Sequence, residues 1–233
     1  MKLFLYIIIL ACVTKSQNYE ISCFGIHIGD VTQKILDNGK IEYEMESAGL
    51  VDLIWPTNNS YYTFFDTETF ALKSWEKNIE QGLNKFSLSA DIDSIDNVLH
   101  YEKKSIQLKN PIFTIFTMLA MIQTQPYEII DTKWFAFEHQ GKLGETRLLW
   151  SDSLMLWSGT DSVMCDHYRM DIKINDSTLT LDSQEDYFMD NIHNENYIRE
   201  FWVKRGNEKE IVQASFKNEW LTLIAKKDHK KDF

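Results

Sequence analysis

Most of this chain alternates apolar and polar side chains with the two-residue period of β-strands, and one short segment breaks that period. Successive side chains of a strand point to opposite faces, so alternation indicates a strand with one buried face. Asn38-Gly39 lies between two such runs and is typical of a tight hairpin turn, because both residues tolerate positive φ. We expect strands at residues 19–29, 40–48, 61–66, 70–78, 83–90, 97–109, 130–138, 143–150, 162–174, 178–181, 197–204, 211–216 and 220–225.

The exception is the segment 111–124, where apolar residues recur at helical spacing. Asn110 is a suitable N-cap, and Pro111 fits the first helical turn because its missing N–H needs no partner there. Pro126 ends the helix. The predicted apolar stripe consists of Ile112, Ile115, Phe116, Leu119 and Ile122. We expect this helix to be largely buried against the concave face of a sheet.

Many strands with one inserted helix predict a mainly β protein. We expect a large curved antiparallel sheet, a sandwich or a partly open barrel, with a central buried helix at about 111–124. No internal repeat and no proline- or serine-rich linker divides the chain. We therefore expect residues 17–233 to form a single β-rich domain.

Residues 1–16 have the pattern of a signal peptide: a positive charge at Lys2, then an apolar stretch, then small or short polar residues before the cleavage site. We expect cleavage after Ser16, which leaves Gln17 as the first residue. A second interpretation stays open, because the residues that end at Cys12 resemble a bacterial lipoprotein signal in which Cys12 would be acylated. Nothing after Ser16 is apolar enough to span a membrane as a helix.

The formal net charge of -11 argues against nucleic-acid binding, which needs clustered lysine and arginine. Removal of residues 1–16 takes away two lysines and no acid, so the mature chain is more acidic still. Such a chain is also repelled from anionic surfaces.

The opening strand, Tyr19-Glu20-Ile21 followed by residues 24–29 (FGIHIG), resembles that of bacterial exported proteins classed as domain of unknown function 3108. The order of parts is similar as well, with a central helix, a tyrosine-bearing strand near residues 165–168 and a closing hairpin. The segment 117–122 departs from the more polar helix of that family. The resemblance implies a β-rich fold and a location in the cell envelope of a Gram-negative bacterium, periplasmic or associated with the outer membrane. It implies no catalytic residues.

The common catalytic motifs are absent from the sequence, including the glycine-rich phosphate loop, the Gly-x-Ser-x-Gly turn, His-Glu-x-x-His and Cys-x-x-Cys. We therefore expect a non-enzymatic protein without a catalytic residue, a cofactor or a metal. An enzyme with scattered residues stays as a third hypothesis. It requires a cleft in which a histidine, one of His100, His139, His167 and His193, meets a carboxylate.

Two cysteines remain after residue 16, Cys23 and Cys165. In an oxidising compartment an even number of cysteines favours a disulfide. Two alternatives stay open. The thiols are unpaired, or they join His27 and His167, which lie on the same strand faces, in a zinc site.

The chain is rich in aromatic residues, with seven tryptophans, ten tyrosines and fourteen phenylalanines. These rings either fill the core or line an apolar cavity in the curved sheet. Our leading hypothesis is an exported cell-envelope protein that binds an apolar ligand. The alternative is a structural or assembly factor of the envelope that acts through protein–protein contacts.

Overall fold

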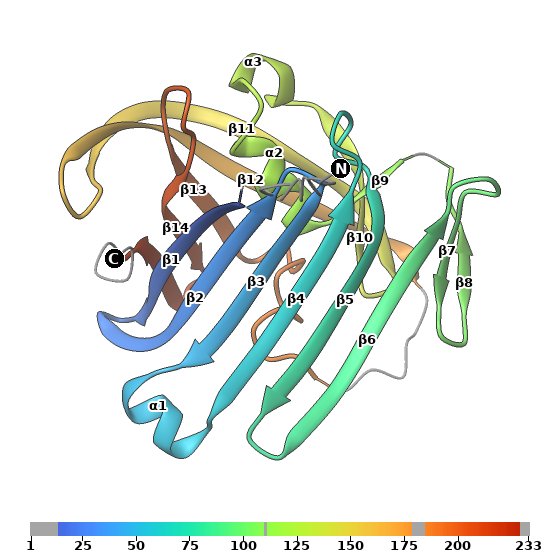
Figure 1. Cartoon of the computed structure of the whole chain (residues 1–233), viewed down its shortest axis with the longest axis horizontal. Coiled ribbons are helices and arrows are strands. Elements are labelled where there is room, and N and C mark those ends of the chain that lie inside the picture. The colour runs from blue at the N-terminus through green and yellow to red at the C-terminus, as the bar shows by residue number, and fades with distance from the viewer. Residues whose placement is uncertain (1–13, 110, 179–184, 229–233) are drawn as a thin grey trace, which may run out of the picture.

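The computed structural model describes residues 14–109, 111–178 and 185–228, and the strands of these residues form one sheet (Figure 1). The sheet is ordered β8-β7-β6-β5-β4-β3-β2-β1-β15-β14-β13-β12-β11-β10-β9. Its first half consists of β1 (Thr14–Cys23), β2 (Ile26–Leu36), β3 (Lys40–Ser47), β4 (Thr57–Phe65), β5 (Leu72–Gln81), β6 (Asn84–Asp93), β7 (Val98–Tyr101) and β8 (Ser105–Gln107). Its second half consists of β9 (Ile112–Phe113), β10 (Trp134–His139), β11 (Lys142–Trp157), β12 (Ser162–Thr178), β13 (Ile198–Lys204), β14 (Ile211–Lys217) and β15 (Thr222–Lys227).

Neighbouring strands are antiparallel except for β9 and β10, which run parallel. The first and last strands pair with each other in the middle of the sheet, where Tyr19 lies opposite Lys227. The chain therefore runs outward from β1 to one edge, β8, continues at the other edge with β9, and returns strand by strand to β15 beside β1. The predicted fold class, a large curved antiparallel sheet with one central buried helix, is confirmed.

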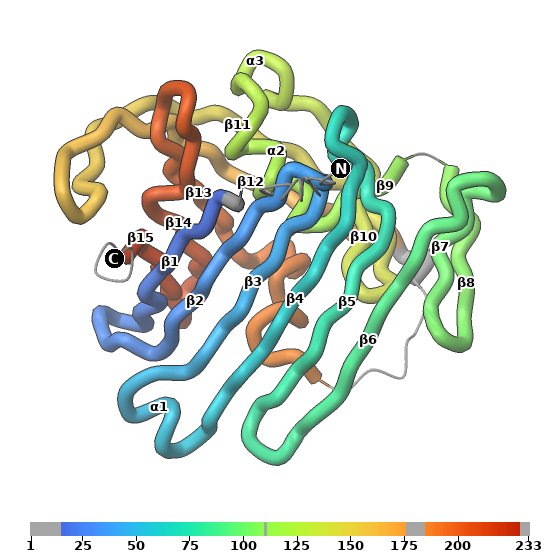
Figure 2. Tube along the Cα trace, in the orientation of Figure 1, coloured from blue at the N-terminus to red at the C-terminus, as the bar shows by residue number. Residues whose placement is uncertain are grey.

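The sheet curls until its two edges approach without pairing (Figure 2). A buried apolar cluster crosses this gap and joins Leu72 and Leu99 to Ile112. Because strand pairing is missing there, side chains alone close the barrel-like shape.

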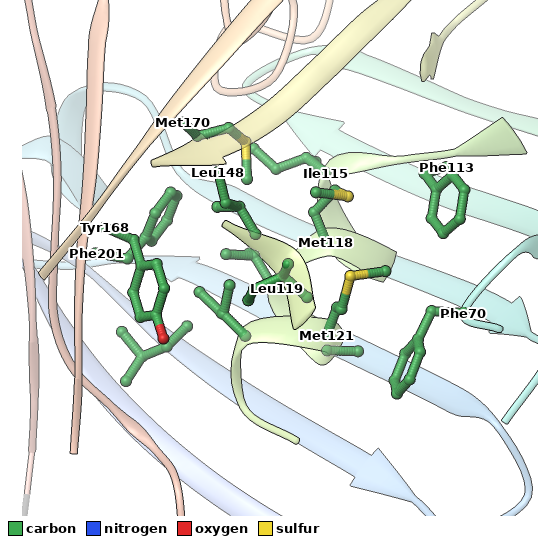
Figure 3. Close-up of a cluster of buried hydrophobic side chains, with 14 of the residues drawn as sticks. Phe70, Phe113, Ile115, Met118, Leu119, Met121, Leu148, Tyr168, Met170 and Phe201 are labelled. Atoms are coloured by element: carbon green, nitrogen blue, oxygen red, sulfur yellow. The ribbon is translucent and has the colours of Figure 1, made fainter. Parts of the chain in front are cut away.

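Helix α2 (Ile115–Ile122) lies inside the curve. Seven of its eight residues are buried, and the exception is Phe116, which is partly buried. Figure 3 shows Met118, Leu119 and Met121 of α2 among side chains from several strands, including Leu148 and Phe201. The helix therefore has no solvent-facing side, and the sheet must surround it.

The structure corrects the start of this helix, which we predicted at residue 111. Ile112 and Phe113 form strand β9 instead. Thr114 is the N-cap: its hydroxyl accepts a hydrogen bond from the Thr117 amide at 3.3 Å, and the Thr117 hydroxyl accepts one from the Thr114 amide at 2.9 Å. This reciprocal capping box fixes the first turn four residues beyond the predicted position.

The predicted strand 19–29 is in fact a hairpin, because Phe24 and Gly25 both take positive φ, 49° and 81°, and turn the chain. The expected strand 97–109 is likewise two short strands, β7 and β8.

The turn at Asn38-Gly39 is confirmed. A Cβ atom at Gly39 would lie 2.3 Å from the carbonyl oxygen of Phe65, so this position requires glycine.

Two further helices are short, α1 (Gly49–Ile54) and α3 (Tyr127–Ile130). Helix α1 has no buried residue, whereas α3 contributes Ile130 to the core. No helix among the described residues combines the length and the apolar character needed to cross a membrane.

We predict that Ile122→Ala lowers the free energy of unfolding by about 2–5 kcal/mol, because Ile122 is fully buried and its loss leaves a void. Phe116→Ala should cost less than half as much, because this ring already borders empty space. Urea denaturation of both variants measures the difference. Equal losses would contradict the packing described for α2.

Candidate functional site

A segment that connects β12 to β13 crosses the concave side of the sheet, and we call its described residues, 185–197, the strap. Figure 2 shows it in orange behind the front strands. The strap consists of turns without a long helix or strand. Its ends are held by two charged groups from opposite halves of the sheet.

Asp186 holds the first end of the strap. It is fully buried and forms an ion pair with Lys77 of β5, whose Nζ lies 3.0 Å from Oδ2. The Tyr61 hydroxyl and the Gln81 amide also donate to this carboxylate, at 3.2 and 3.4 Å. A buried carboxylate needs such complete pairing, because an unpaired charge in the interior is costly. Burial, together with the charge of Asp186, raises the pKa of Tyr61 well above its ordinary value, so its hydroxyl remains a donor.

Arg199 of β13 holds the second end. Its guanidinium donates to three carbonyl oxygens of the strap, those of Ile192, Asn194 and Tyr197. The side chain is buried, with 2% of its surface exposed. Burial lowers the pKa of Arg199 to about 10, and no carboxylate among the described residues forms an ion pair with it.

Two histidines lie where the strap meets β10. The rings of His139 and His193 have centroids 5.3 Å apart, and Lys142 donates to Nε2 of His193 at 2.9 Å. Burial lowers the pKa of His139 well below its usual value and that of His193 to about 4, and the neighbouring positive groups act in the same direction. Both rings are therefore neutral at pH 7.

Glu138, the neighbour of His139, joins the two edges of the sheet. It accepts hydrogen bonds from Trp75 at 2.9 Å and from the Gly141 amide at 2.8 Å, and a short one from Tyr101. Burial raises the pKa of this carboxyl group above its ordinary value. Both of its oxygens are occupied, so the arrangement suits a structural acceptor better than a general base.

An apolar cavity of about 230 Å³ lies between α2, the strap and the inner face of the sheet. Aliphatic and aromatic side chains form most of its wall, and they come from β1–β4, from β13–β15, from Phe116 of α2 and from Met189 of the strap. Ala214 and Ala225 lie opposite each other on β14 and β15, where they leave room that larger side chains would fill. The cavity therefore has the character of a small-molecule site.

Four polar side chains contribute to this wall, and two of them, Tyr61 and Ser215, donate hydrogen bonds to carboxylate groups. One of the other two is Arg199. The other is Tyr43, whose hydroxyl is buried and has no hydrogen-bond partner among the residues that the structure describes. The Tyr43 ring packs against Phe116 with centroids 4.8 Å apart. Burial holds the pKa of Tyr43 far above its ordinary value, so the hydroxyl keeps its proton and can donate it in a hydrogen bond.

Exposed apolar side chains gather at one end of the sheet, and we call them the rim. They occupy the β1–β2 turn, α1, the β5–β6 turn and the β14–β15 turn, of which the first three lie at the lower end in Figure 1. Cys23 pairs with Leu223, which places the fourth turn at the same end. Leu223 and Ile21 line the cavity, so the rim borders it. The rim consists of Phe24, Ile26, Leu50, Leu53, Ile54, Leu83 and Trp220, each more than 60% exposed.

The structure does not form the disulfide that we expected between Cys23 and Cys165. Both are free thiols, and β15, β14 and β13 lie between their strands, β1 and β12. Cys12, the alternative lipidation site, lies outside the described residues. The hypothetical zinc ligands are also apart, since His27 contacts Asp30 whereas His167 stacks on Trp202.

Of the four histidines in the enzyme hypothesis, His139 and His193 come together, but next to Lys142 and not next to a carboxylate that could act as their partner. His167 approaches Asp152 at 3.1 Å, on the side of β12 opposite to the buried Tyr168. His100 contacts the Ser105 hydroxyl in an exposed position. The structure thus brings none of them into the cavity.

Sequence reasoning missed Lys77, Asp186 and Arg199. The two basic residues did carry a signal, because each is a lone charge on the apolar face of a predicted strand. Lys77 alternates in register with Trp75 and Ile79, and Arg199 with Phe201. A charge at such a position is expected to have a buried partner. Asp186 lies in a polar segment that shows neither the periodicity of a strand nor that of a helix, so nothing in the sequence indicated that it would be buried.

We predict that Lys77→Met destabilises the protein by about 3–5 kcal/mol or releases the strap, because it leaves the Asp186 carboxylate without its cation. Lys85→Met is the matched control, since it breaks an exposed ion pair with Glu80 and should cost less than about 1 kcal/mol. Urea denaturation and hydrogen exchange of residues 185–197 measure both effects. A strap that stays protected at unchanged stability would refute the anchoring role.

We also predict that His193 contributes a loss of stability on acidification. Its folded pKa of about 4 lies below the unfolded value of about 6.5, so only the unfolded chain gains a proton between these values and stability falls as the pH falls through this window. The raised pKa values of Glu138 and Asp190 act in the opposite sense, so variants must be compared. His193→Gln should lose less stability than the parent between pH 7 and pH 5, by about 1 kcal/mol. Identical pH profiles for the two proteins would count against a neutral, buried His193.

No family model matches this chain, and no curated protein matches it. The resemblance to domain of unknown function 3108 therefore stays a prediction. Among solved structures, the chain is similar to a beta-barrel-like protein of domain of unknown function DUF1849 from Brucella abortus. The two are 9% identical, the match covers 93% of this chain and 96% of that chain, and the TM-score is 0.54. Similarity at this level of identity shows a shared fold: this chain is a beta-barrel-like protein built on one open, curved sheet.

Proposed function

We propose that this protein is a non-enzymatic binding protein of the cell envelope that holds a small apolar ligand inside its curved sheet. The observation that carries the proposal is the cavity of about 230 Å³ bordered by α2, the strap and both halves of the sheet. Its wall is apolar, and a void of this kind favours apolar molecules over water. The third hypothesis, an enzyme, has no comparable support, because no histidine named for it lines the cavity.

The position of the cavity supports an exchange of ligand with the surroundings. It lies at the end of the sheet that carries the rim, where seven large apolar side chains are exposed. The strap contributes Phe188, Met189 and Ile192 to the wall and is held by side-chain anchors, without strand pairing. Release of the strap from one anchor would therefore open the cavity without breaking the sheet.

The proposed location rests on the sequence of residues 1–16, which reads as an export signal. The last residues of this segment, 14–16, belong to β1 and pair with residues 34–36. Expression of the full chain in a Gram-negative host, followed by mass measurement of the purified protein, tests the proposal. A mature chain that begins at Gln17, or one acylated at Cys12, supports export, whereas an uncut chain in the cytosol rejects it.

We predict that N-phenyl-1-naphthylamine, a neutral apolar fluorophore, binds in the cavity with a saturable increase in fluorescence. Ala225→Phe should weaken this binding at least tenfold, because the added ring occupies the void that Ala225 leaves. The variant should remain folded, since the ring enters empty space.

Ile224→Phe is the matched control, because residue 224 lies on the same strand but points to the opposite face of the sheet. It should bind the fluorophore like the parent. Absence of saturable binding by the parent, or equal binding by all three proteins, would reject the cavity as a ligand site.

The rim favours a second candidate function, that of an assembly factor which contacts an envelope protein. Leu83 is 99% exposed and Leu53 is 81% exposed, and exposed apolar clusters mark interaction surfaces. Crosslinking in envelope extracts tests this candidate. One reproducible protein partner that is lost in a Leu53→Ser, Leu83→Ser double variant supports it, and a crosslinking pattern unchanged by the double variant rejects it.

A further inference from the structure

The cavity contains a feature that a purely apolar ligand does not explain, the positive charge of Arg199. Its side chain lines the cavity and is 2% exposed. Burial lowers its pKa and the charges of Asp171 and Glu195 act to raise it, but neither carboxylate forms an ion pair with it. Arg147 and Arg169 contact the two oxygens of Asp171 at 2.9 Å. Within the described part of the chain, Arg199 therefore forms no direct ion pair.

The hydrogen bonds of Arg199 leave part of the guanidinium free. The group has five N–H donors, and three of them reach carbonyl oxygens of the strap. Carbonyl oxygens satisfy these donors but do not neutralise the charge. A guanidinium buried without a counter-ion is costly, which explains why burial lowers its pKa to about 10. The remaining donors and the unpaired charge suit an anion.

Tyr43 also lines the cavity, from the other half of the sheet. Its hydroxyl is buried and has no partner among the described residues. The rest of the wall is nearly all apolar and includes Phe116, Leu119 and Phe201. One cation, one hydroxyl and an apolar surface together complement a molecule with one small acidic group and an apolar body.

We propose that the cavity binds an amphipathic monocarboxylate, such as a fatty acid, with its carboxylate paired to Arg199 and its apolar chain within the cavity. This inference rests on the proposed function and assigns the class of its ligand. A planar carboxylate fits the two parallel N–H groups that a guanidinium offers. The pairing links the ligand to the strap, because the same guanidinium holds the carbonyl groups of residues 192–197. A bound carboxylate therefore stabilises the closed position of the strap.

The test compares two ligands that differ only in the head group, decanoate and 1-decanol, as competitors of N-phenyl-1-naphthylamine at pH 8. We expect decanoate to displace the fluorophore at a concentration at least tenfold lower than decanol. Only decanoate carries a negative charge that can pair with the Arg199 guanidinium. Hydrogen exchange of residues 185–197 should slow with decanoate and change less with decanol.

The outcomes separate this inference from the proposed function. Equal displacement by the two competitors, or tighter binding of decanol, overturns the carboxylate assignment and leaves the apolar site intact. Failure of both competitors, together with no binding of the fluorophore, overturns both proposals. This comparison uses the parent protein, so it does not depend on a variant that folds.

Arg199→Met adds a test of the residue itself and should abolish the preference for decanoate over decanol. Arg169→Met is the matched control, because Arg169 is exposed on β12 and pairs with Asp171 outside the cavity. It should keep the preference. An Arg199→Met protein that folds and still prefers decanoate by tenfold would contradict the assignment.

Discussion

The enclosure of α2 is the constraint on which the rest of the structure depends. A helix buried on every side cannot rest on a flat sheet, so one sheet has to curl around it until β5–β7 meet β9 and β10. The helix is short, about 12 Å for its eight residues, whereas a ten-residue strand such as β5 spans about 33 Å. The helix therefore fills only part of the interior, and the cavity occupies the part beside its N-terminal half, near Phe116.

Closure without strand pairing explains where the buried charges lie. Two of them cross a boundary that the backbone does not bridge: Glu138 of β10 accepts from Trp75 of β5, and Lys77 pairs with Asp186 of the strap. Arg199 ties the strap to β13, the strand that follows it in the chain. Buried polar pairs of this kind fix one geometry where apolar packing would allow several. Unlike Lys77, Arg199 forms no ion pair among the described residues and is held by neutral carbonyl oxygens. The group that holds the strap is therefore also the group that we propose pairs with the ligand.

Local signals in the sequence predicted the strands and the presence of a buried helix. Asn38-Gly39 identified a turn because its φ preference is intrinsic to those residues. Phe24-Gly25 did not, because the alternation of apolar residues continues across this turn. The helix start was misplaced because Thr114 and Thr117 are unremarkable apart from the bonds they form with each other. The cavity and the partnership of Lys77 with Asp186, 109 residues apart, depend on the curvature of the whole sheet, which no local period encodes.

The central claim is that the interior next to α2 is hollow and apolar. A crystal structure of the protein under xenon pressure tests it most directly, because xenon enters apolar voids without needing a specific contact. The account predicts xenon density between Phe116 and Ala225, bounded by Ile21 and Phe201. A continuous packing of side chains across that space, with no xenon in it, would contradict the account.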